Sequence, residues 1–357
     1  MTTIMMRRAD RPAEDRRLSA EWEPQSAVML TWPHADSDWA DTLAAADRTF
    51  AAIAAAISHH QTVLVTLARS AERERVEAAL QEAGADRAHV RFANAPSDDV
   101  FVRDHGPLTV ATSHGLKLLD FSFNGWGRKY PYQRDDALTR TLYEQGAFGH
   151  IPREAVDFVL EGGSIDSDGA GTLLVTASCL LAPTRNPQHT RADIEAILAA
   201  QLGAQRILWL HHGYLAGDDT DGHIDTLARF CDPATIAYCA CPYADDEHYP
   251  ALQAMEQELK TLRTADGQPY RLVPLPWPSA KLANDGTRLP ATYANFLILN
   301  GAVLVPTYDD SKDTEALAIL SACFPGRRII GIPCLTLIAQ HGSLHCVTMQ
   351  IPAGVLT

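Results

Sequence analysis

The sequence predicts an α/β fold built from five repeated units that close into a ring. Segments with helical periodicity alternate with short strand-like runs, and hairpin-like stretches lie between these helix and strand pairs. The order hairpin, helix, strand recurs at intervals of roughly 50–70 residues, which is typical of repeat architectures. Five such units use up the ordered part of the 357 residues, a length that buries a large core without disulfides or a structural metal.

Six segments place apolar residues at helical spacing, with charged residues between them. These predicted helices span residues 40–58, 70–83, 135–145, 189–202, 247–264 and 312–323. Each is followed within a few residues by a β-rich run. The predicted strands span residues 62–68, 89–95, 155–161, 206–212, 270–276 and 327–333.

Four hairpins are predicted, at residues 107–123, 171–183, 224–241 and 294–309. The first contains a Ser-His-Gly turn and the last an Asn-Gly turn, both of which favour tight hairpins. The fifth hairpin has no local partner, so we expect the run at 344–352 to pair with residues 27–33. That pairing closes the ring and removes exposed sheet edges.

Residues 1–20 are expected to form a disordered or extended N-terminal arm. No Gly/Ser-rich or Pro-rich linker divides the remainder, so residues 21–357 are expected to form a single domain closed by its N- and C-terminal segments. The N-terminus lacks the apolar region of a secretory signal, and apolar stretches such as 171–183 are too short to span a bilayer. The odd number of cysteines, seven, then indicates reduced thiols in the cytoplasm.

The overall charge favours a cationic ligand. Lys and Arg number 30 against 44 Asp and Glu, a formal net charge of −14. Such a surface repels the phosphates of nucleic acids and anionic lipids, and it concentrates small cations. We therefore expect no nucleic-acid or membrane partner. A homo-oligomer is compatible with the sequence.

Polar residues follow the last strand of each predicted unit and are candidates for one shared site. In a closed ring the equivalent ends of successive units face one axis, so residues far apart in sequence are expected to converge. Any one of them alone is better explained as an ordinary polar turn. The candidates are Asp104, Glu161, His223, Asp225, Asn295 and Cys346.

The segment 211–225 admits two interpretations. It contains His211, His212, Asp218, Asp219, Asp221, His223 and Asp225. These ligands suit a metal-assisted hydrolase, although neither the HExxH spacing nor a clear third ligand is present. Alternatively His223 is a general acid/base, and Asp225 lies on the same face of an extended segment and presents its carboxylate to the same pocket.

Cys346 lies among Leu, Val and Met, where cysteine is usually a small buried hydrophobic residue. The preceding His-Gly-Ser permits a close backbone approach that a plain core strand does not need. The other six cysteines are interpreted as packing residues, because the Cys-Ala-Cys at 239–241 has no second pair at zinc spacing. Arg103 and Asp104 alone are compatible with a surface ion pair, and Glu161 with a turn beside two glycines.

Taken together, seven motifs resemble the agmatine deiminase and bacterial peptidylarginine deiminase family of guanidine-modifying enzymes. They are FVRD at 101–104, FNGWG at 123–127, EGGSI at 161–165, RNP at 185–187, DGHID at 221–225, TYANF at 292–296 and HC at 345–346. The resemblance runs from about Trp22 to Pro352, in the family's order. It implies a five-bladed α/β propeller (pentein) of ββαβ units with pseudo-fivefold symmetry.

The resemblance also implies a role for each candidate. Cys346 matches the family nucleophile, His223 the general acid/base, and Asp104 and Asp225 the carboxylates that grip a guanidinium. Glu161 matches the glutamate beside the histidine, and Asn295 resembles an asparagine that holds substrate or conformation. Paired carboxylates suit a planar cation, and a thiolate can attack its central carbon. No metal or organic cofactor is implied.

The implied substrate is a small cationic guanidine, and agmatine is ranked first. Its hydrolysis would give N-carbamoylputrescine and ammonia through a covalent amidino-cysteine. Peptide-bound and then free arginine, giving citrulline, are the alternatives; free arginine would need a basic partner such as Arg128, Arg134 or Arg185. Phe101 stands where the family commonly has Trp, and His-Gly-Ser where it has three glycines, so the pocket mouth differs. A metal-assisted hydrolase and a non-catalytic polyamine-binding propeller are the rival classes.

Overall fold

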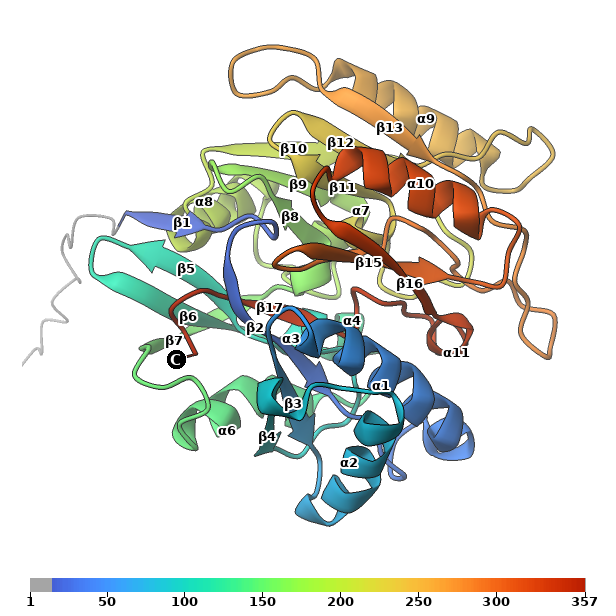
Figure 1. The fold of residues 1–357 in the computed structure, drawn as a ribbon. Helices are drawn as coiled ribbons and strands as arrows, with labels where there is room; N and C mark the ends of the chain where they lie inside the picture. Colours follow the sequence, from blue (N-terminus) through green and yellow to red (C-terminus); the bar gives the residue numbers. More distant parts are fainter. Residues whose placement is uncertain (1–14, 357) are drawn as a thin grey trace, which may run out of the picture.

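The computed structural model describes residues 15–356, and its strands form five small mixed sheets (Figure 1). The first sheet contains β1 (Arg16–Leu18), β5 (Leu108–Thr112), β6 (Gly115–Ser122) and β7 (Arg153–Val159). The second contains β8 (Ile165–Ser167), β9 (Thr172–Thr176) and β10 (Arg206–Leu210). The third contains β11 (Ala228–Asp232), β12 (Thr235–Cys239) and β13 (Arg271–Leu275). The fourth contains β14 (Leu297–Ile298), β15 (Ala302–Thr307) and β16 (Arg328–Pro333), and the fifth β17 (Met349–Pro352), β2 (Gln25–Thr31), β3 (Thr62–Leu67) and β4 (Val90–Asn94).

All five sheets repeat one arrangement. A central strand pairs antiparallel with one neighbour and parallel with the strand that follows a helix. The connecting helices are α1 (Leu43–Ser58), α6 (Leu138–Glu144), α8 (Arg191–Leu202), α9 (Tyr249–Thr261) and α10 (Asp313–Cys323). A further helix, α2 (Arg73–Glu82), leads to β4, which pairs parallel with β3. The predicted order of hairpin, helix and strand and all six predicted helices are therefore confirmed.

Shorter helical turns lie between these elements. They are η1 (Ala40–Thr42), η2 (Ser70–Glu72), η3 (Arg87–His89), α3 (Val102–His105), α4 (Gly125–Arg128), α5 (Gln133–Asp136), η4 (Gly162–Ser164), α7 (Ala177–Leu180), η5 (Ile224–Thr226) and α11 (Leu335–Ile338).

The fifth sheet is made from both ends of the described chain. Strand β17 pairs antiparallel with β2, and Met349 lies opposite Met29. In Figure 1 the red β17 lies beside the blue β2. The backbone N–H of Ala353 also donates to the Pro24 carbonyl at 2.8 Å. The predicted pairing of the two terminal segments is confirmed.

Helix α8 shows how local sequence sets the bounds of an element. Thr190 and Asp193 form a capping box: the Thr190 hydroxyl accepts from the Asp193 N–H (3.3 Å), and the Asp193 carboxylate accepts from the Thr190 N–H (2.8 Å). The helix ends at Gly203, which adopts the left-handed conformation with φ 73°. A β-carbon there would overlap the carbonyl of Arg16, so glycine also lets β1 pass close to the helix.

Among the regular elements, the structure differs from the prediction at one hairpin. The predicted hairpin at 171–183 is a strand, β9, followed by the helical turn α7, and β9 pairs instead with the preceding β8. A short apolar run does not by itself distinguish strand from helix, which explains the error. Within the predicted arm, β1 pairs with β5 as an edge strand. Residues 1–14 of the arm lie outside the described residues.

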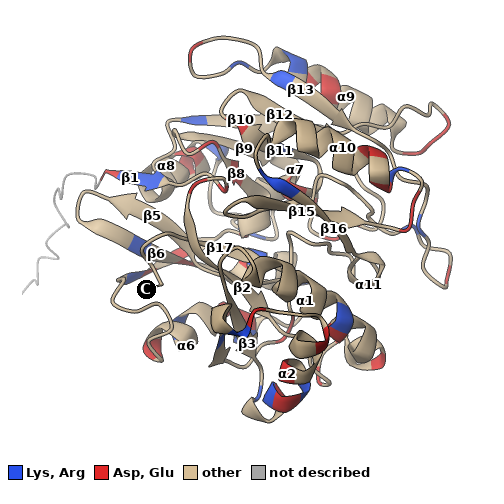
Figure 2. Cartoon of the chain, viewed as in Figure 1, with Lys and Arg blue, Asp and Glu red and all other residues tan. Residues whose placement is uncertain are grey.

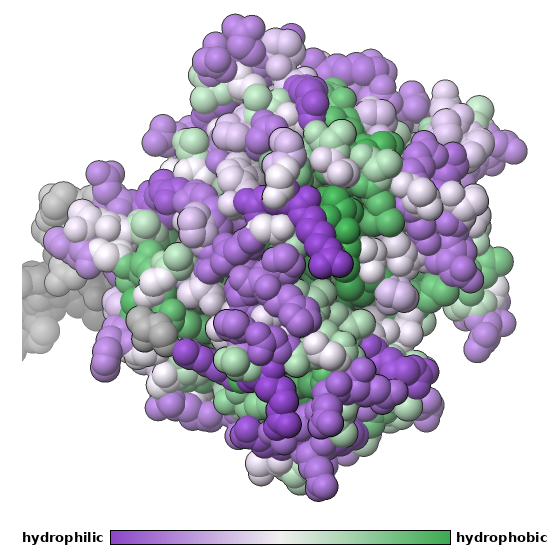
Figure 3. All heavy atoms as spheres, in the orientation of Figure 1, coloured by the Kyte–Doolittle hydropathy of each residue, from purple (hydrophilic) through white to green (hydrophobic). Residues whose placement is uncertain are grey.

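Charges of both signs are mixed on the exterior. Figure 2 shows acidic and basic residues side by side on α2, where Arg73 and Glu77 form an ion pair at 2.8 Å. Most of the face in Figure 3 is hydrophilic, with a hydrophobic area in the region of α10. Within residues 15–356 no helix is both long and apolar enough to cross a membrane.

Candidate active site

Every predicted site residue lies shortly before the first strand of one of the five hairpin units. Asp104 is in α3 before β5, and Glu161 directly precedes η4 and β8. His223 and Asp225 are at η5 before β11, Asn295 precedes β14, and Cys346 precedes β17. The repeat therefore carries one or two polar groups at the same place in each unit.

Gly163 marks the point at which three of these side chains meet. A β-carbon on Gly163 would lie 2.6 Å from His223 Nδ1, 2.8 Å from Asp104 Oδ1 and 3.1 Å from Asp225 Oδ2. The Gly163 N–H donates to Asp104 Oδ1 at 2.9 Å, and His223 Nδ1 is 3.6 Å from that oxygen. Because glycine has no side chain, two carboxylates and an imidazole share one buried space.

The thiol of Cys346 contacts the same group. Its Sγ is 3.9 Å from Asp225 Oδ2 and 3.5 Å from Asn295 Oδ1. The Asn295 amide braces this arrangement, because its oxygen accepts from the His345 N–H (2.8 Å) and its nitrogen donates to the Asp225 carbonyl (3.2 Å). Asn295 thus ties the segment with the thiol to the segment with the carboxylate.

His223 and Asp225 do not share one face of an extended segment, contrary to the prediction. Ile224–Thr226 form a 3-10 turn, and the His223 N–H donates to the Thr220 hydroxyl at 3.0 Å. The turn directs His223 toward Asp104, whereas Asp225 Oδ2 lies 2.8 Å from His345 Nδ1. Both side chains nevertheless border the space at Gly163.

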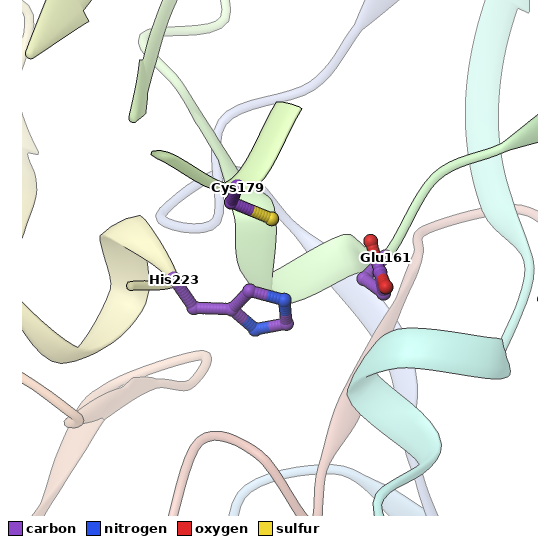
Figure 4. A group of neighbouring side chains, drawn as sticks. All are labelled: Glu161, Cys179 and His223. Atoms are coloured by element: carbon purple, nitrogen blue, oxygen red, sulfur yellow. The ribbon is translucent and has the colours of Figure 1, made fainter. Parts of the chain in front are cut away.

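Glu161 is paired with an arginine, not with the histidine alone. Arg185 Nε contacts both Glu161 oxygens, at 2.8 and 3.0 Å, and both side chains are fully buried. Figure 4 shows the His223 ring extending toward Glu161 with the Cys179 sulfur above it, and the potential ligand atoms of the three residues lie within 4.8 Å of one another. Since Arg185 already occupies the carboxylate, this trio does not offer a free set of metal ligands.

Burial favours a raised pKa at both aspartates, but the neighbouring groups give the two residues shifts in opposite directions. It raises the pKa of Asp104 to about 6, against the charge on His223 and together with that on Asp225. Burial also opposes ionisation of Asp225, but hydrogen bonding and charge from His345 outweigh it and lower the pKa below its usual value. Asp225 is therefore ionised over the physiological range.

The pKa values of Cys346 and His223 are also shifted. Burial raises the pKa of the Cys346 thiol well above its usual value, and the Asp225 and Asp104 carboxylates raise it further. For His223, burial lowers the pKa but the Asp104 carboxylate and Cys179 outweigh it, so the pKa ends well above its usual value. Without a bound cation, the site therefore holds a thiol beside an imidazolium.

These groups adjoin an acidic cavity of about 400 Å³. Asp104 and Cys346 line it, and three further carboxylates come from Asp38, Asp99 and Asp219. The remaining lining residues are Phe101, Trp126, Tyr130, Thr220, Gln340, His341 and Gly342. Within residues 15–356, no lysine or arginine lines this cavity. The charge of the cavity favours a cation.

The two positions that differ from the family motifs, Phe101 and the His-Gly-Ser run at 341–343, contact each other. Phe101 packs at a ring distance of 5.8 Å from Trp126, and a β-carbon on Gly342 would overlap the Phe101 ring. Trp126 in turn donates from Nε1 to Asp104 Oδ2 at 3.0 Å. Sequence reasoning did not single out Trp126, although it lies in the FNGWG motif.

The basic residues considered for a substrate carboxylate are placed elsewhere. Arg185 is buried, and besides Glu161 it contacts Asp221 Oδ2 at 2.6 Å. Neither Arg128 nor Arg134 lines the cavity. Among the described residues, His223 is the one member of segment 211–225 in a potential group of metal ligands, and its partners there are Glu161 and Cys179.

A buried charge network behind Cys346 was also missed. His345 Nε2 lies 2.7 Å from Glu21 Oε2, and Arg229 Nη2 lies 2.8 Å from the same oxygen. Glu21 and His345 are 324 positions apart, so spacing could not reveal the contact. The only available signal was the position of His345 directly before the nucleophile candidate.

Comparison with known proteins identifies the family. The family model described as Porphyromonas-type peptidyl-arginine deiminase matches residues 17–352. The chain belongs to this family. The agmatine deiminase of Stutzerimonas stutzeri (strain A1501) is 36% identical to this chain. The match covers 94% of this chain and 95% of the length of that protein.

Solved structures of the family superpose closely. A C. jejuni agmatine deiminase, in a cysteine-to-serine variant with substrate bound, is 35% identical with a TM-score of 0.89, and covers 98% of this chain and 100% of its own. A structure from Porphyromonas gingivalis, provisionally named an arginine deiminase, is 48% identical with a TM-score of 0.89, and covers 96% of this chain and 100% of its own.

Proposed function

We propose that the chain hydrolyses the guanidinium group of agmatine to N-carbamoylputrescine and ammonia, through a covalent amidino-cysteine on Cys346. The observation that carries this proposal is the meeting of a thiol, an imidazole and two carboxylates beside an acidic cavity. It agrees with the names of the curated relatives, which are agmatine deiminases at about 35% identity over nearly the whole chain.

Asp104 and Asp225 bind the guanidinium. Asp225 Oδ1 is buried and has no hydrogen-bond partner among the described residues, which is a costly state for a carboxylate oxygen. A planar cation with several N–H donors satisfies that oxygen and pairs its charge. Two fixed anions in a desolvated site also orient the central carbon toward the sulfur.

The substrate's own charge activates the nucleophile. The carboxylates that raise the pKa of Cys346 are neutralised when a cation lies between them, so the thiol then loses its proton more readily. The thiolate sulfur forms a bond to the guanidinium carbon, and the C=N electron pair moves to nitrogen. No metal is required for this step.

His223 then transfers protons in both halves of the reaction. As an imidazolium it protonates the leaving nitrogen, ammonia departs, and the remaining nitrogens carry the positive charge of the amidino-cysteine. The neutral imidazole next takes a proton from water, and the hydroxide oxygen bonds to the same carbon. Collapse expels the Cys346 thiolate and releases the carbamoyl product. Glu161, held by Arg185, supports the positive charge of the ring.

The cavity chemistry ranks agmatine above arginine. The distal end of agmatine is a primary ammonium, whereas free arginine has a carboxylate near the same place. Asp38, Asp99 and Asp219 attract the first and repel the second, and no cation among the described lining residues compensates. Peptide-bound and free arginine remain the alternative substrates, which the provisional name of the Porphyromonas gingivalis structure keeps open.

The repeated sheets support a five-bladed propeller with pseudo-fivefold symmetry as the arrangement behind this site. Each blade is a ββαβ unit, and each presents its polar residue before its first strand. We include in the proposal that residues 21–357 act as one catalytic domain and that the protein works in the cytoplasm. Its seven cysteines, all in the described residues, are free thiols.

Steady-state comparison of agmatine, free arginine and a blocked arginyl peptide tests the substrate. We expect kcat/KM for agmatine to exceed that for free arginine by at least about 100-fold, because the acidic cavity discriminates by charge. An equal or larger value for either arginine substrate would exclude agmatine as the preferred one.

Covalent trapping tests the chemistry. Replacement Cys346→Ser should abolish ammonia release, and a haloacetamidine should label Cys346 in the wild-type protein. Cys323→Ser is the matched control, because Cys323 lies at the end of α10 and does not line the cavity, so it should leave turnover unchanged. Substantial turnover by Cys346→Ser would contradict the mechanism.

A further inference from the structure

Both ring nitrogens of the buried His345 contact carboxylates. Nδ1 is 2.8 Å from Asp225 Oδ2, and Nε2 is 2.7 Å from Glu21 Oε2. An ionised carboxylate only accepts hydrogen bonds, so each side of the ring needs a proton. The three groups must therefore share two protons, held either as an imidazolium or with one carboxyl group protonated.

The surroundings of Glu21 place the second proton on the ring. Glu21 Oε2 is also 2.8 Å from Arg229 Nη2 and 3.9 Å from Arg103 Nη2, and Glu21 Oε1 accepts from the Ile298 N–H at 2.7 Å. Burial opposes ionisation of Glu21, but Arg229 outweighs it and the pKa lies below its usual range. With both carboxyl groups ionised, the two short contacts require a proton on each ring nitrogen.

His345 acts away from the substrate. It does not line the cavity at Cys346, but lines a second one of about 340 Å³ together with Glu21 and Arg103. Its side chain reaches the active site only through Asp225. An effect of the His345 side chain on the reaction is therefore expected to act through that carboxylate.

The contact also determines which oxygen of Asp225 is free. Oδ2 is taken by His345 Nδ1 and faces Cys346 Sγ, whereas Oδ1 is buried and without a hydrogen-bond partner among the described residues. Rotation of the carboxylate would give up the charge-assisted bond to the ring. The orphaned oxygen is thus held available for a ligand.

We propose that His345 is a positioning residue. Held as an imidazolium between Glu21 and Asp225, it keeps Asp225 ionised and turned so that its free oxygen meets the guanidinium. This inference rests on the proposed function, since it names the group that prepares the substrate-binding carboxylate.

Two substitutions separate the effect of the donor at His345 Nδ1 from the effect of the ring's volume. The amide N–H of His345→Asn can take the place of Nδ1–H and bond Asp225, whereas that of His345→Gln can take the place of Nε2–H and reach Glu21. We expect KM for agmatine to rise at least tenfold in His345→Gln and clearly less in His345→Asn. A purely structural role does not predict this order, and His114→Gln, on an exposed turn, should change neither KM nor kcat.

The charge of the ring is measured without substitution of the site. In wild-type protein with 15N-labelled histidine, the His345 signals, assigned by through-bond correlation to the His345 backbone, should show protons on both ring nitrogens at pH 8. A neutral ring with one N–H would overturn the proposal, even if neither variant folds.

The kinetic outcomes are also decisive. An equal or larger KM in His345→Asn than in His345→Gln, or an unchanged KM in both, would overturn the positioning role. Failure of the wild-type protein to release ammonia from agmatine would instead refute the proposed function, and the 15N spectrum would still report the charge of His345.

Discussion

Asp104 and Asp225 border the same space, but their charges are stabilised unequally. Asp225 is hydrogen-bonded to the His345 ring at 2.8 Å. Asp104 accepts from neutral donors, the Gly163 N–H and the Trp126 indole, and faces His223 at a longer 3.6 Å. Burial therefore dominates at Asp104 and raises its pKa to about 6. The two carboxylates that are proposed to bind the guanidinium therefore lose their charge at different pH values.

This difference predicts an acid limb in the activity. Asp104 loses its charge as the pH falls below about 6, whereas Asp225 keeps its charge. We expect kcat/KM for agmatine to fall about tenfold per pH unit below that point, because a neutral carboxyl group no longer pairs with the guanidinium. A pH profile from 5 to 8 measures it, and a flat profile would argue against an ionised Asp104 in substrate binding.

The Asp99 carboxylate is expected to favour substrate binding but to lower the stability of the folded protein. It lines the cavity half-buried, and burial raises its pKa to about 6. A raised carboxyl pKa means that the folded state holds the proton more tightly, so stability is lost as the pH rises from about 4 to 6. Asp99→Asn should therefore increase the free energy of unfolding at pH 8, by at most about 2 kcal/mol after solvent screening.

The same substitution should raise KM for agmatine, because one carboxylate facing the ammonium end is removed. Urea unfolding at pH 8 and at pH 4 measures the stability, and the gain should vanish at pH 4. A gain of equal size at both pH values would show that charge is not its cause.

At the scale of elements, the short turn η4 matters because of what it omits. Gly162 and Gly163 bring the backbone against Arg103, His223 and Asp104 with no side chain between. A β-carbon on Gly163 would enter the space where the guanidinium is proposed to bind. The backbone of this turn therefore forms one wall of the site.

Gly163→Ala is expected to abolish most ammonia release while the protein still folds. The methyl group would lie within 2.8 Å of both His223 Nδ1 and Asp104 Oδ1, so these side chains must move apart. Thermal unfolding followed by circular dichroism checks the fold, and ammonia release checks the site. Activity within a few-fold of wild type would contradict the placement of the binding space.

Regular elements were predictable, but the contacts between them were not. Periodicity located the helices because each buries one apolar face, such as Ile194, Leu198 and Leu202 of α8. The two-residue β14 and the 3-10 turn at Asp225 depend on tertiary contacts and have no period of their own. The candidate acids, histidine and thiol came from motifs, whereas the Arg185 partner of Glu161 and the Glu21 partner of His345 needed coordinates.

At the scale of the whole molecule, the C-terminal segment lies beside β2, since β17 pairs with β2 and the Leu356 N–H donates to the Ser26 hydroxyl at 3.2 Å. Residue 15 leads into β1 at the edge of the first sheet, so a linker from residue 356 to residue 15 must pass the ends of β5 and β6. The exposed turn at Asp285 and Gly286 is a suitable place for new termini, because it lies away from the cavity.

A circular permutant that joins residue 356 to residue 15 and opens at 285–286 should fold and keep kcat for agmatine within about threefold. The pairing of β17 with β2 becomes local in that variant, so refolding should also be faster. Ammonia release and stopped-flow refolding measure both. An inactive but folded permutant would show that the site needs its original order of connections.

The placement of Cys346 just before the last strand, β17, has a consequence for synthesis. Translation produces both aspartates, the histidine and the asparagine before it produces Cys346. The sheet that begins with β2 gains its last strand, β17, only after the other four sheets have been synthesised. A growing chain on the ribosome is therefore expected to lack the proposed hydrolytic activity until the sheet of β2 and β17 is complete.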